Sequence, residues 1–234
     1  MPRPPRLDLP GVPQHVVQRG NNRTACFFGD ADRRFYLKCL SESATRRGCA
    51  VHAYALMSNH VHILATPDTS GAIGMMMQDV GRRYVRVINT LHARAGTLWE
   101  ARFRASLIDS ENYLLLCQRY IELNPVRAGI VTDPASYLWS SHTYYASGRG
   151  NGLVTEHDVY LRLGSSTAER RSAYLSLFAK PLDDVVVARI RGAVNSDSAF
   201  GSDAFLDDAE AKLGRSVRLP VRGRPAKSVT GKLL

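Results

Sequence analysis

Cysteines are scarce in this sequence, and long apolar runs are absent. The four cysteines, Cys26, Cys39, Cys49 and Cys117, form no CxxC pair and are too few for a disulfide-stapled secreted domain. Reduced, partly buried thiols of a cytosolic protein are the simplest interpretation. No run approaches the roughly 18 apolar residues of a membrane span, and no apolar segment follows residues 1–6. The sequence therefore predicts neither a transmembrane helix nor a signal peptide.

Acidic residues are outnumbered by basic ones. The chain of 234 residues has 31 Lys and Arg against 21 Asp and Glu, a formal net charge of +10. A protein this basic often binds a polyanion, most commonly nucleic acid. The alternative is a charged surface that only aids solubility. The hydrophobic fraction of 44% is ordinary for a protein with a packed core.

Apolar periodicity and turn residues divide the first 124 residues into alternating strands and helices. We expect strands at 14–19, 49–56, 60–65 and 98–108, and helices at 30–47, at 72 to about 95, and at 111 to about 124. The order is βαββαβ followed by a helix. This order predicts an α+β fold of the ferredoxin-like, split βαβ type, with helices packed on one face of an antiparallel sheet.

The rest of the chain indicates an appendage to that domain. A Gly-rich stretch at 147–152 separates a domain of residues 1–148 from an extension. Residues 149–214 have helical patterning, with candidate helices at 169–179, 185–193 and 203–213. Residues 215–234 contain six basic residues and no acidic one, which is typical of a flexible basic tail.

Two short patterns carry candidate chemistry. His60 and His62 lie two apart on a predicted strand, so their side chains point to the same face and can bind one metal ion. Tyr120 and Asn124 lie four apart on a predicted helix, so the hydroxyl and the amide oxygen can converge. Taken singly, each pattern has an ordinary alternative: two unrelated surface histidines, or a half-buried Tyr and a helix-ending Asn.

Together the two patterns resemble a known family. The HVH of residues 60–62, preceded by MSN, resembles the HUH motif of the HUH endonucleases. The run RYIELNPVRAG at 119–129 resembles the catalytic helix of the single-tyrosine (Y1) transposases of IS200/IS605-type elements. QRGNNR at 18–23 and WSS at 139–141 resemble the REP-associated tyrosine transposases in particular. The four segments occur in the right order, and the resemblance covers roughly residues 10–148.

The resemblance implies a metal-dependent single-stranded DNA endonuclease and strand transferase. Tyr120 would attack a phosphodiester, forming a 5′-phosphotyrosine and a free 3′-OH, and a second 3′-OH would rejoin the DNA without ATP. His60, His62 and Asn124 would hold a divalent metal ion, Mg²⁺ or Mn²⁺, that polarises the scissile phosphate. Because imidazole suits Mn²⁺ better than Mg²⁺, we expect activity at lower concentrations of Mn²⁺.

Other tyrosines and histidines are weaker candidates. Tyr113 and Tyr84 have no polar residue four positions on, so Tyr120 is preferred as the nucleophile. The remaining histidines have no partner at ligand spacing, and we interpret them as structural or surface residues. They are His15, His52, His92, His142 and His157.

Basic side chains are the candidate DNA contacts. They follow the first strand, line the second helix and alternate along the fourth strand: Arg19, Arg23, Arg82, Arg83, Arg86, Arg102 and Arg104. In the tail, Arg222 and Arg224 flank Gly223 in an AT-hook-like sequence suited to a narrow minor groove; the alternative is a disordered basic tail that binds any polyanion. Trp99 and Phe103 are candidates either for stacking on unpaired bases or for the core.

The expected partner is single-stranded or hairpin DNA, including REP-like hairpins, bound by a monomer or a homodimer without a membrane. A DNA-processing protein of this type is expected in the cytoplasm, associated with the nucleoid. Two alternatives remain open. One is a non-catalytic DNA-binding protein of the same fold. The other is a metal-dependent phosphoesterase without a covalent step, whose activity would survive Tyr120→Phe.

Overall fold

The computed structural model describes residues 5–148, 150 and 152–220. Its centre is a four-stranded sheet made of β1 (Gln14–Arg19), β2 (Cys49–Leu56), β3 (His60–Pro67) and β4 (Arg104–Leu107). The strand order is β2-β3-β1-β4, and each neighbouring pair is antiparallel. Within the described part of the chain, no helix is both long and apolar enough to span a bilayer.

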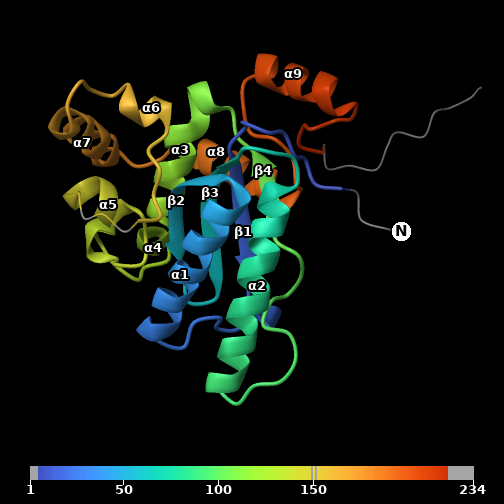
Figure 1. The fold of residues 1–234 in the computed structure, drawn as a ribbon. Coiled ribbons are helices and arrows are strands. Elements are labelled where there is room, and N and C mark those ends of the chain that lie inside the picture. Colours follow the sequence, from blue (N-terminus) through green and yellow to red (C-terminus); the bar gives the residue numbers. More distant parts are fainter. Residues whose placement is uncertain (1–4, 149, 151, 221–234) are drawn as a thin grey trace, which may run out of the picture.

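Two long helices cover one face of the sheet. α1 (Asp30–Arg47) and α2 (Ala72–Leu91) lie side by side in front of the strands in Figure 1. Their buried residues, including Tyr36, Leu40 and Tyr84, form one apolar cluster with Val16 and Ile63 of the sheet. The predicted ferredoxin-like arrangement, an antiparallel sheet with helices packed on a face, is confirmed.

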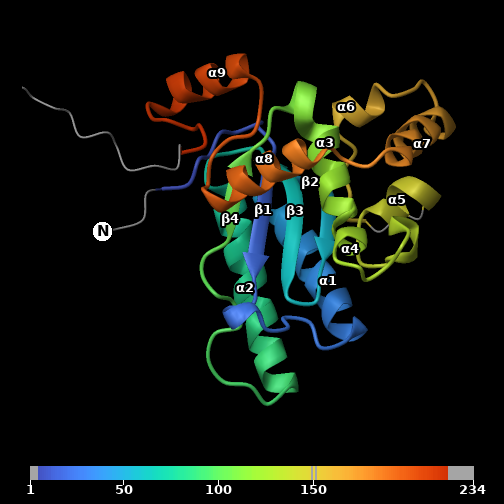
Figure 2. The same cartoon turned by 180° about the vertical axis from the view of Figure 1, so that it is seen from behind.

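The opposite face of the sheet is covered by α3 (Ser110–Glu122) and α8 (Asp184–Asn195), as Figure 2 shows. Leu114 and Ile121 of α3 and Ile190 of α8 share a second apolar cluster with Leu64 of β3. The helix α8 lies in the predicted C-terminal extension, so part of the extension is packed directly on the central sheet. The domain boundary near residue 148 remains a prediction.

The fourth strand is shorter than the predicted strand at 98–108, because β4 contains only Arg104–Leu107. Leu98 and Trp99 are adjacent and both are buried in the cluster beneath α1 and α2. Consecutive residues of a strand point to opposite faces, so this pair cannot both be buried there in regular strand geometry. Trp99 and Phe103 are core residues, which leaves neither available for stacking on bases.

Two helix ends also differ slightly from expectation. α2 ends at Leu91, because Ala93 adopts a left-handed φ of 48°. α3 ends at Glu122, and Asn124 begins a separate short helix, α4 (Asn124–Arg127), with a Pro in its first turn. Pro at this position lacks only an N–H that the helix start does not use.

The extension is helical, as its patterning predicts. It contains α6 (Asp158–Leu161), α7 (Thr167–Ser176), α8 and α9 (Asp203–Leu213), and α5 (His142–Ser147) precedes it. Among the described residues, 3-10 turns occur at Asn21–Arg23, Pro134–Ser136 and Leu177–Ala179.

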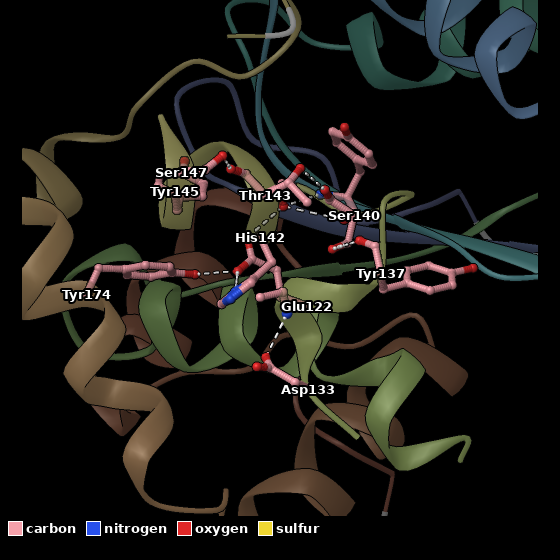
Figure 3. A network of polar contacts seen from close by, with 12 residues as sticks. Glu122, Asp133, Tyr137, Ser140, His142, Thr143, Tyr145, Ser147 and Tyr174 are labelled. Atoms are coloured by element: carbon pink, nitrogen blue, oxygen red, sulfur yellow. Dashed lines mark hydrogen bonds and ion pairs between the residues drawn. The ribbon is translucent and has the colours of Figure 1, made fainter. Parts of the chain in front are cut away.

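A buried carboxylate joins the extension to α3. Glu122 is fully buried and accepts hydrogen bonds from Ser141 Oγ at 2.6 Å, His142 Nδ1 at 3.1 Å and the Tyr174 hydroxyl at 2.9 Å. Figure 3 shows His142 and Tyr174 converging on this carboxylate. The contacts connect α3 to α5 and α7 through a satisfied buried network, which specifies one packing of the three helices.

Candidate active site

His60 and His62 lie on the face of β3 that α3 and α8 cover. Alternation along the strand places both imidazoles on that face, and their ring centroids are 5.0 Å apart. β3 is a central strand paired with both β1 and β2, so the backbone under the two rings is held on each side.

Each imidazole is oriented by a hydrogen bond at its Nδ1. His60 Nδ1 lies 2.6 Å from Asn59 Oδ1, and Asn59 Nδ2 donates to the carbonyl of Arg23 at 3.0 Å. That second bond fixes the amide orientation, so Asn59 presents an acceptor and His60 Nδ1 carries the proton. The lone pair of His60 is then on Nε2, which is the arrangement of a typical metal ligand.

His62 has a buried histidine as its partner. His15 Nε2 lies 2.9 Å from His62 Nδ1, and the two rings stack with centroids 5.1 Å apart. When His62 Nδ1 donates to His15, the lone pair of His62 is on Nε2. His15 was expected to be structural or at the surface. It is completely buried and contacts a candidate ligand, which its spacing in the sequence does not reveal.

Burial keeps both candidate ligands neutral. Desolvation lowers the pKa of His60 to about 4 and holds the pKa of His62 well below its ordinary value, with nearby positive groups adding to both effects. A neutral imidazole is the form that binds a metal ion. The two rings therefore fit a divalent metal across the neutral pH range.

Tyr120 and Asn124 approach the histidines from α3 and α4. The Tyr120 ring lies 6.0 Å from the His62 ring and 5.7 Å from the His15 ring. Asn124 Nδ2 donates to the carbonyls of Tyr120 at 3.1 Å and Ile121 at 3.3 Å, which leaves Oδ1 as the free end of the amide. All these side chains belong to one chain.

Arg127 is a site residue that sequence reasoning did not single out. Its guanidinium carbon lies 4.2 Å from the centre of the Tyr120 ring, and Nη2 donates to the Tyr120 carbonyl at 2.6 Å. Nε and Nη1 are buried without a hydrogen-bond partner among the described residues. Burial lowers the pKa of Arg127, although the group stays cationic at neutral pH. A half-buried cation with two donor nitrogens that lack a partner suits an oxyanion.

These residues line one pocket of about 380 Å³. It contains His60, His62, Tyr120 and Asn124, together with Arg19, Arg127 and Arg191. None of the described residues that line it is acidic. Nowhere in the described ranges do three His, Cys, Asp or Glu side chains gather to hold a metal. A metal ion here would therefore have two imidazoles and the Asn124 amide as protein ligands, and water or substrate oxygens would complete its coordination.

The other predicted DNA contacts lie in three places. Arg23, Arg102 and Arg104 line a neighbouring groove that also includes Arg19. Arg82, Arg83 and Arg86 are on α2, on the sheet face away from the pocket, and Arg83 pairs with Glu42 at 2.6 Å. Arg222 and Arg224 lie outside the described residues. The structure thus brings Arg19 to the pocket and separates the α2 arginines from it.

Comparisons with known proteins find similarity to transposases. A model of the family described as "Transposase IS200 like" matches residues 10–124. A REP-associated tyrosine transposase bound to a REP hairpin has a similar fold, with a TM-score of 0.54 and 17% identity over 68% of this chain and 93% of that one.

A second solved structure, of a Deinococcus radiodurans R1 protein described as a transposase, matches with a TM-score of 0.37 and 23% identity over 52% of this chain and 95% of that one. Among curated proteins, none matches the chain. The matched segment contains the two histidines, the tyrosine and the asparagine of the pocket. Residues 10–124 belong to the IS200-like transposase family.

Proposed function

We propose that this transposase cuts and rejoins single-stranded DNA, with Tyr120 as the nucleophile and a divalent metal ion held by His60, His62 and Asn124. The observation that carries the proposal is the single pocket in which these four side chains meet three arginines, Arg19, Arg127 and Arg191, and no described carboxylate. A phosphodiester is the substrate that such a pocket accommodates, because its negative charge is complementary to the positively charged lining.

In the first step, the Tyr120 hydroxyl gives up its proton and its oxygen attacks the phosphorus, the bond between phosphorus and the 3′-oxygen breaks, and the leaving 3′-oxygen takes up a proton, which gives a 5′-phosphotyrosine and a free 3′-OH. Arg127, stacked on the Tyr120 ring, stabilises negative charge on the phenolic oxygen and on the phosphate. In the second step, a 3′-OH attacks the adduct and releases Tyr120, so one phosphodiester replaces another and no external energy source is needed.

The metal ion, when bound, supplies Lewis-acid polarisation of the scissile phosphate. The protein contributes two neutral imidazoles whose Nδ1 atoms are held by Asn59 and His15. Because the ligands are nitrogen and amide oxygen, Mn²⁺ should support activity at lower concentration than Mg²⁺. Equal or better activity in Mg²⁺ at every concentration would count against a histidine-ligated site.

The fold similarity to a REP-associated transposase bound to a REP hairpin supports hairpin-forming DNA as the first substrate to try. The test uses labelled single-stranded DNA from the flanks of the gene, incubated with Mn²⁺ and run on a denaturing gel. A covalent protein–DNA band is expected with the native chain and with Tyr113→Phe, the control on the same helix. Tyr120→Phe should give no band.

Two outcomes would overturn the proposal. Cleavage that survives Tyr120→Phe would indicate a phosphoesterase without a covalent step. Binding without cleavage across several candidate flanks, in every sample, would indicate a DNA-binding protein that has the fold without the reaction.

A further inference from the structure

The C-terminal extension forms one wall of a basic groove beside the candidate active site. The groove has a volume of about 960 Å³ and is lined by seven arginines and only two carboxylates, those of Glu100 and Asp197. Val17, Arg19 and Asn195 line both the groove and the active-site pocket, so the two cavities adjoin.

One wall comes from the transposase domain. The end of β1 contributes Arg19, and the segment that leads into β4 contributes Arg102 and Arg104. Arg19 and Arg102 are exposed, and neither forms an ion pair with any described residue. Their charges are therefore free to meet an anion.

The facing wall comes from the extension. The C-terminal end of α8 contributes Asn195, the following turn contributes Asp197 and Ser198, and Arg215 follows α9. Arg191, one turn before Asn195, points into the adjoining pocket. Like Arg19, Arg191 and Arg215 have no acidic partner in the part of the chain that the structure describes. Arg218 differs, since Asp203 and Asp207 pair with it.

The wall formed by the extension is hydrogen-bonded to the edge of the sheet. β4 is the edge strand, and an unpaired edge normally leaves backbone groups free. Here Asp197 Oδ1 accepts from the Ala105 N–H at 2.9 Å, and the Phe200 N–H donates to the Leu107 carbonyl at 2.8 Å. Arg104 also donates to the carbonyl of Asn195. The chain after α8 is thus held along the edge of β4, at a fixed distance from the opposite arginines.

The apolar face of α8 supports the same placement. Val187, Ile190 and Ala193 are buried in the cluster shared with α3 and β3, whereas Arg191 is exposed toward the pocket. Arg191 lies near enough to Arg127 for the two positive charges to repel, which contributes to lowering the pKa of Arg127. An anion between the two guanidinium groups would relieve that repulsion.

We infer that α8 and residues 195–215 complete a binding groove for the sugar–phosphate backbone of single-stranded DNA, which enters the active-site pocket past Arg191. This inference rests on the proposed function for the identity of the polymer. The transposase family match stops at residue 124, so the extension adds a DNA contact surface that the matched segment does not contain.

The test measures binding of fluorescein-labelled dT15 at several salt concentrations, in a Tyr120→Phe background so that no covalent step contributes. The variants are Arg191→Gln with Arg215→Gln, and Arg191→Lys, which retains the charge. The control is Arg171→Gln on α7, which removes one charge from the extension and lines neither cavity.

The double variant should bind dT15 at least about tenfold more weakly at moderate salt, since charge-assisted phosphate contacts are each strong. Its log–log salt slope should fall by about 1.4, the value for two phosphate contacts on a single strand. Arg191→Lys should retain most of the slope. All variants should unfold at the same temperature, because Arg191 is exposed and unpaired.

If the double variant binds dT15 within twofold of Arg171→Gln and has the same salt slope, the inference is wrong. Failure of the proposed function looks different, because it is scored by loss or persistence of the Tyr120 adduct on the denaturing gel. A groove that binds dT15 without any adduct would retain the inference and remove the transferase.

Discussion

The contact between His15 and His62 makes a sharp prediction about metal affinity. His15 Nε2 lies 2.9 Å from His62 Nδ1, and both rings are buried. Replacing His15 with Leu removes the ring nitrogen that pairs with His62 Nδ1 and that acts as the acceptor when His62 is in its metal-binding tautomer. His62 Nδ1 would then be left without a partner in a buried site, and the ring would be free to present either nitrogen to the pocket.

The size of the effect follows from what such outer contacts contribute. Loss of a group that orients a metal-binding histidine costs about 10–100-fold in affinity, which corresponds to about 1.4–2.7 kcal/mol. We expect the dissociation constant for Mn²⁺ to rise by that factor in His15→Leu. His15→Gln, whose amide oxygen can accept from His62, should recover part of the loss.

Titration calorimetry with Mn²⁺ measures the affinity directly and does not depend on DNA cleavage. Circular dichroism and urea unfolding of each variant separate loss of the ligand's orientation from loss of the fold. A well-folded His15→Leu protein with native Mn²⁺ affinity would refute the assignment of His15 as the residue that positions His62.

Three further predictions concern the stability of the Glu122 network, the pH dependence of stability, and the coupling between binding of Mn²⁺ and binding of DNA. Tyr174→Phe removes one hydrogen bond to Glu122 and should lower the free energy of unfolding by about 1 kcal/mol, and Glu122→Gln should lower it by about 3 kcal/mol because it disrupts the buried pair with His142. The control is Tyr160→Phe, whose hydroxyl has no partner among the described residues, and it should cost under about 0.5 kcal/mol. Urea titrations measure all three values. Burial lowers the pKa of His52 to about 4, so the unfolded chain binds a proton here below about pH 6.5 and the folded chain does not. This residue alone should remove up to about 3 kcal/mol of stability as the pH drops from 6.5 to 4, in addition to the losses from the buried His15, His60 and His62. His52→Gln should therefore make the pH profile of stability shallower by about that amount without flattening it. Because three arginines and no described carboxylate line the pocket, Mn²⁺ and dT15 should each increase the affinity for the other in calorimetry, and independent binding would contradict this charge argument.

The sequence predicts most of the fold because local signals and packing agree. Asp30 and Gly48 bound α1, and Gly48 adopts the left-handed φ of 61° that ends a helix. The segment before β4 was assigned wrongly because its alternation resembles a strand. Leu98 and Trp99 are instead both drawn into the core beneath α2. Burial of two adjacent side chains is decided by tertiary packing, which a pattern of apolar residues does not contain.

In the candidate site, too, residues related by local spacing could be predicted, and residues brought in by tertiary packing could not. His60, His62, Tyr120 and Asn124 are recognisable because each pair lies within one strand or one helical segment, where spacing fixes the shared face. His15 contacts His62 only because β1 pairs with β3, and Arg191 lines the pocket only because α8 packs on the sheet. The position of His15 two residues before Val17, on the same strand face, would identify it only once the register with His62 is known.

The composition of the pocket bears on whether Tyr120 or a water molecule attacks the phosphate. A hydrolase without a covalent step must activate a water molecule, either with a general base or with the metal ion itself. The described residues that line the pocket include no carboxylate, and His60 has a pKa of about 4 while that of His62 is well below its ordinary value, so both are weak bases at neutral pH. Tyr120 is the only group in that lining with a nucleophilic oxygen attached to the protein, and Arg127 lies over its ring. The lining therefore supplies a protein nucleophile but no protein base for a free water molecule, which leaves metal-activated water as the competitor of Tyr120. Metal-dependent hydrolysis by Tyr120→Phe would show that such a water attacks the phosphate and would contradict the assignment of Tyr120.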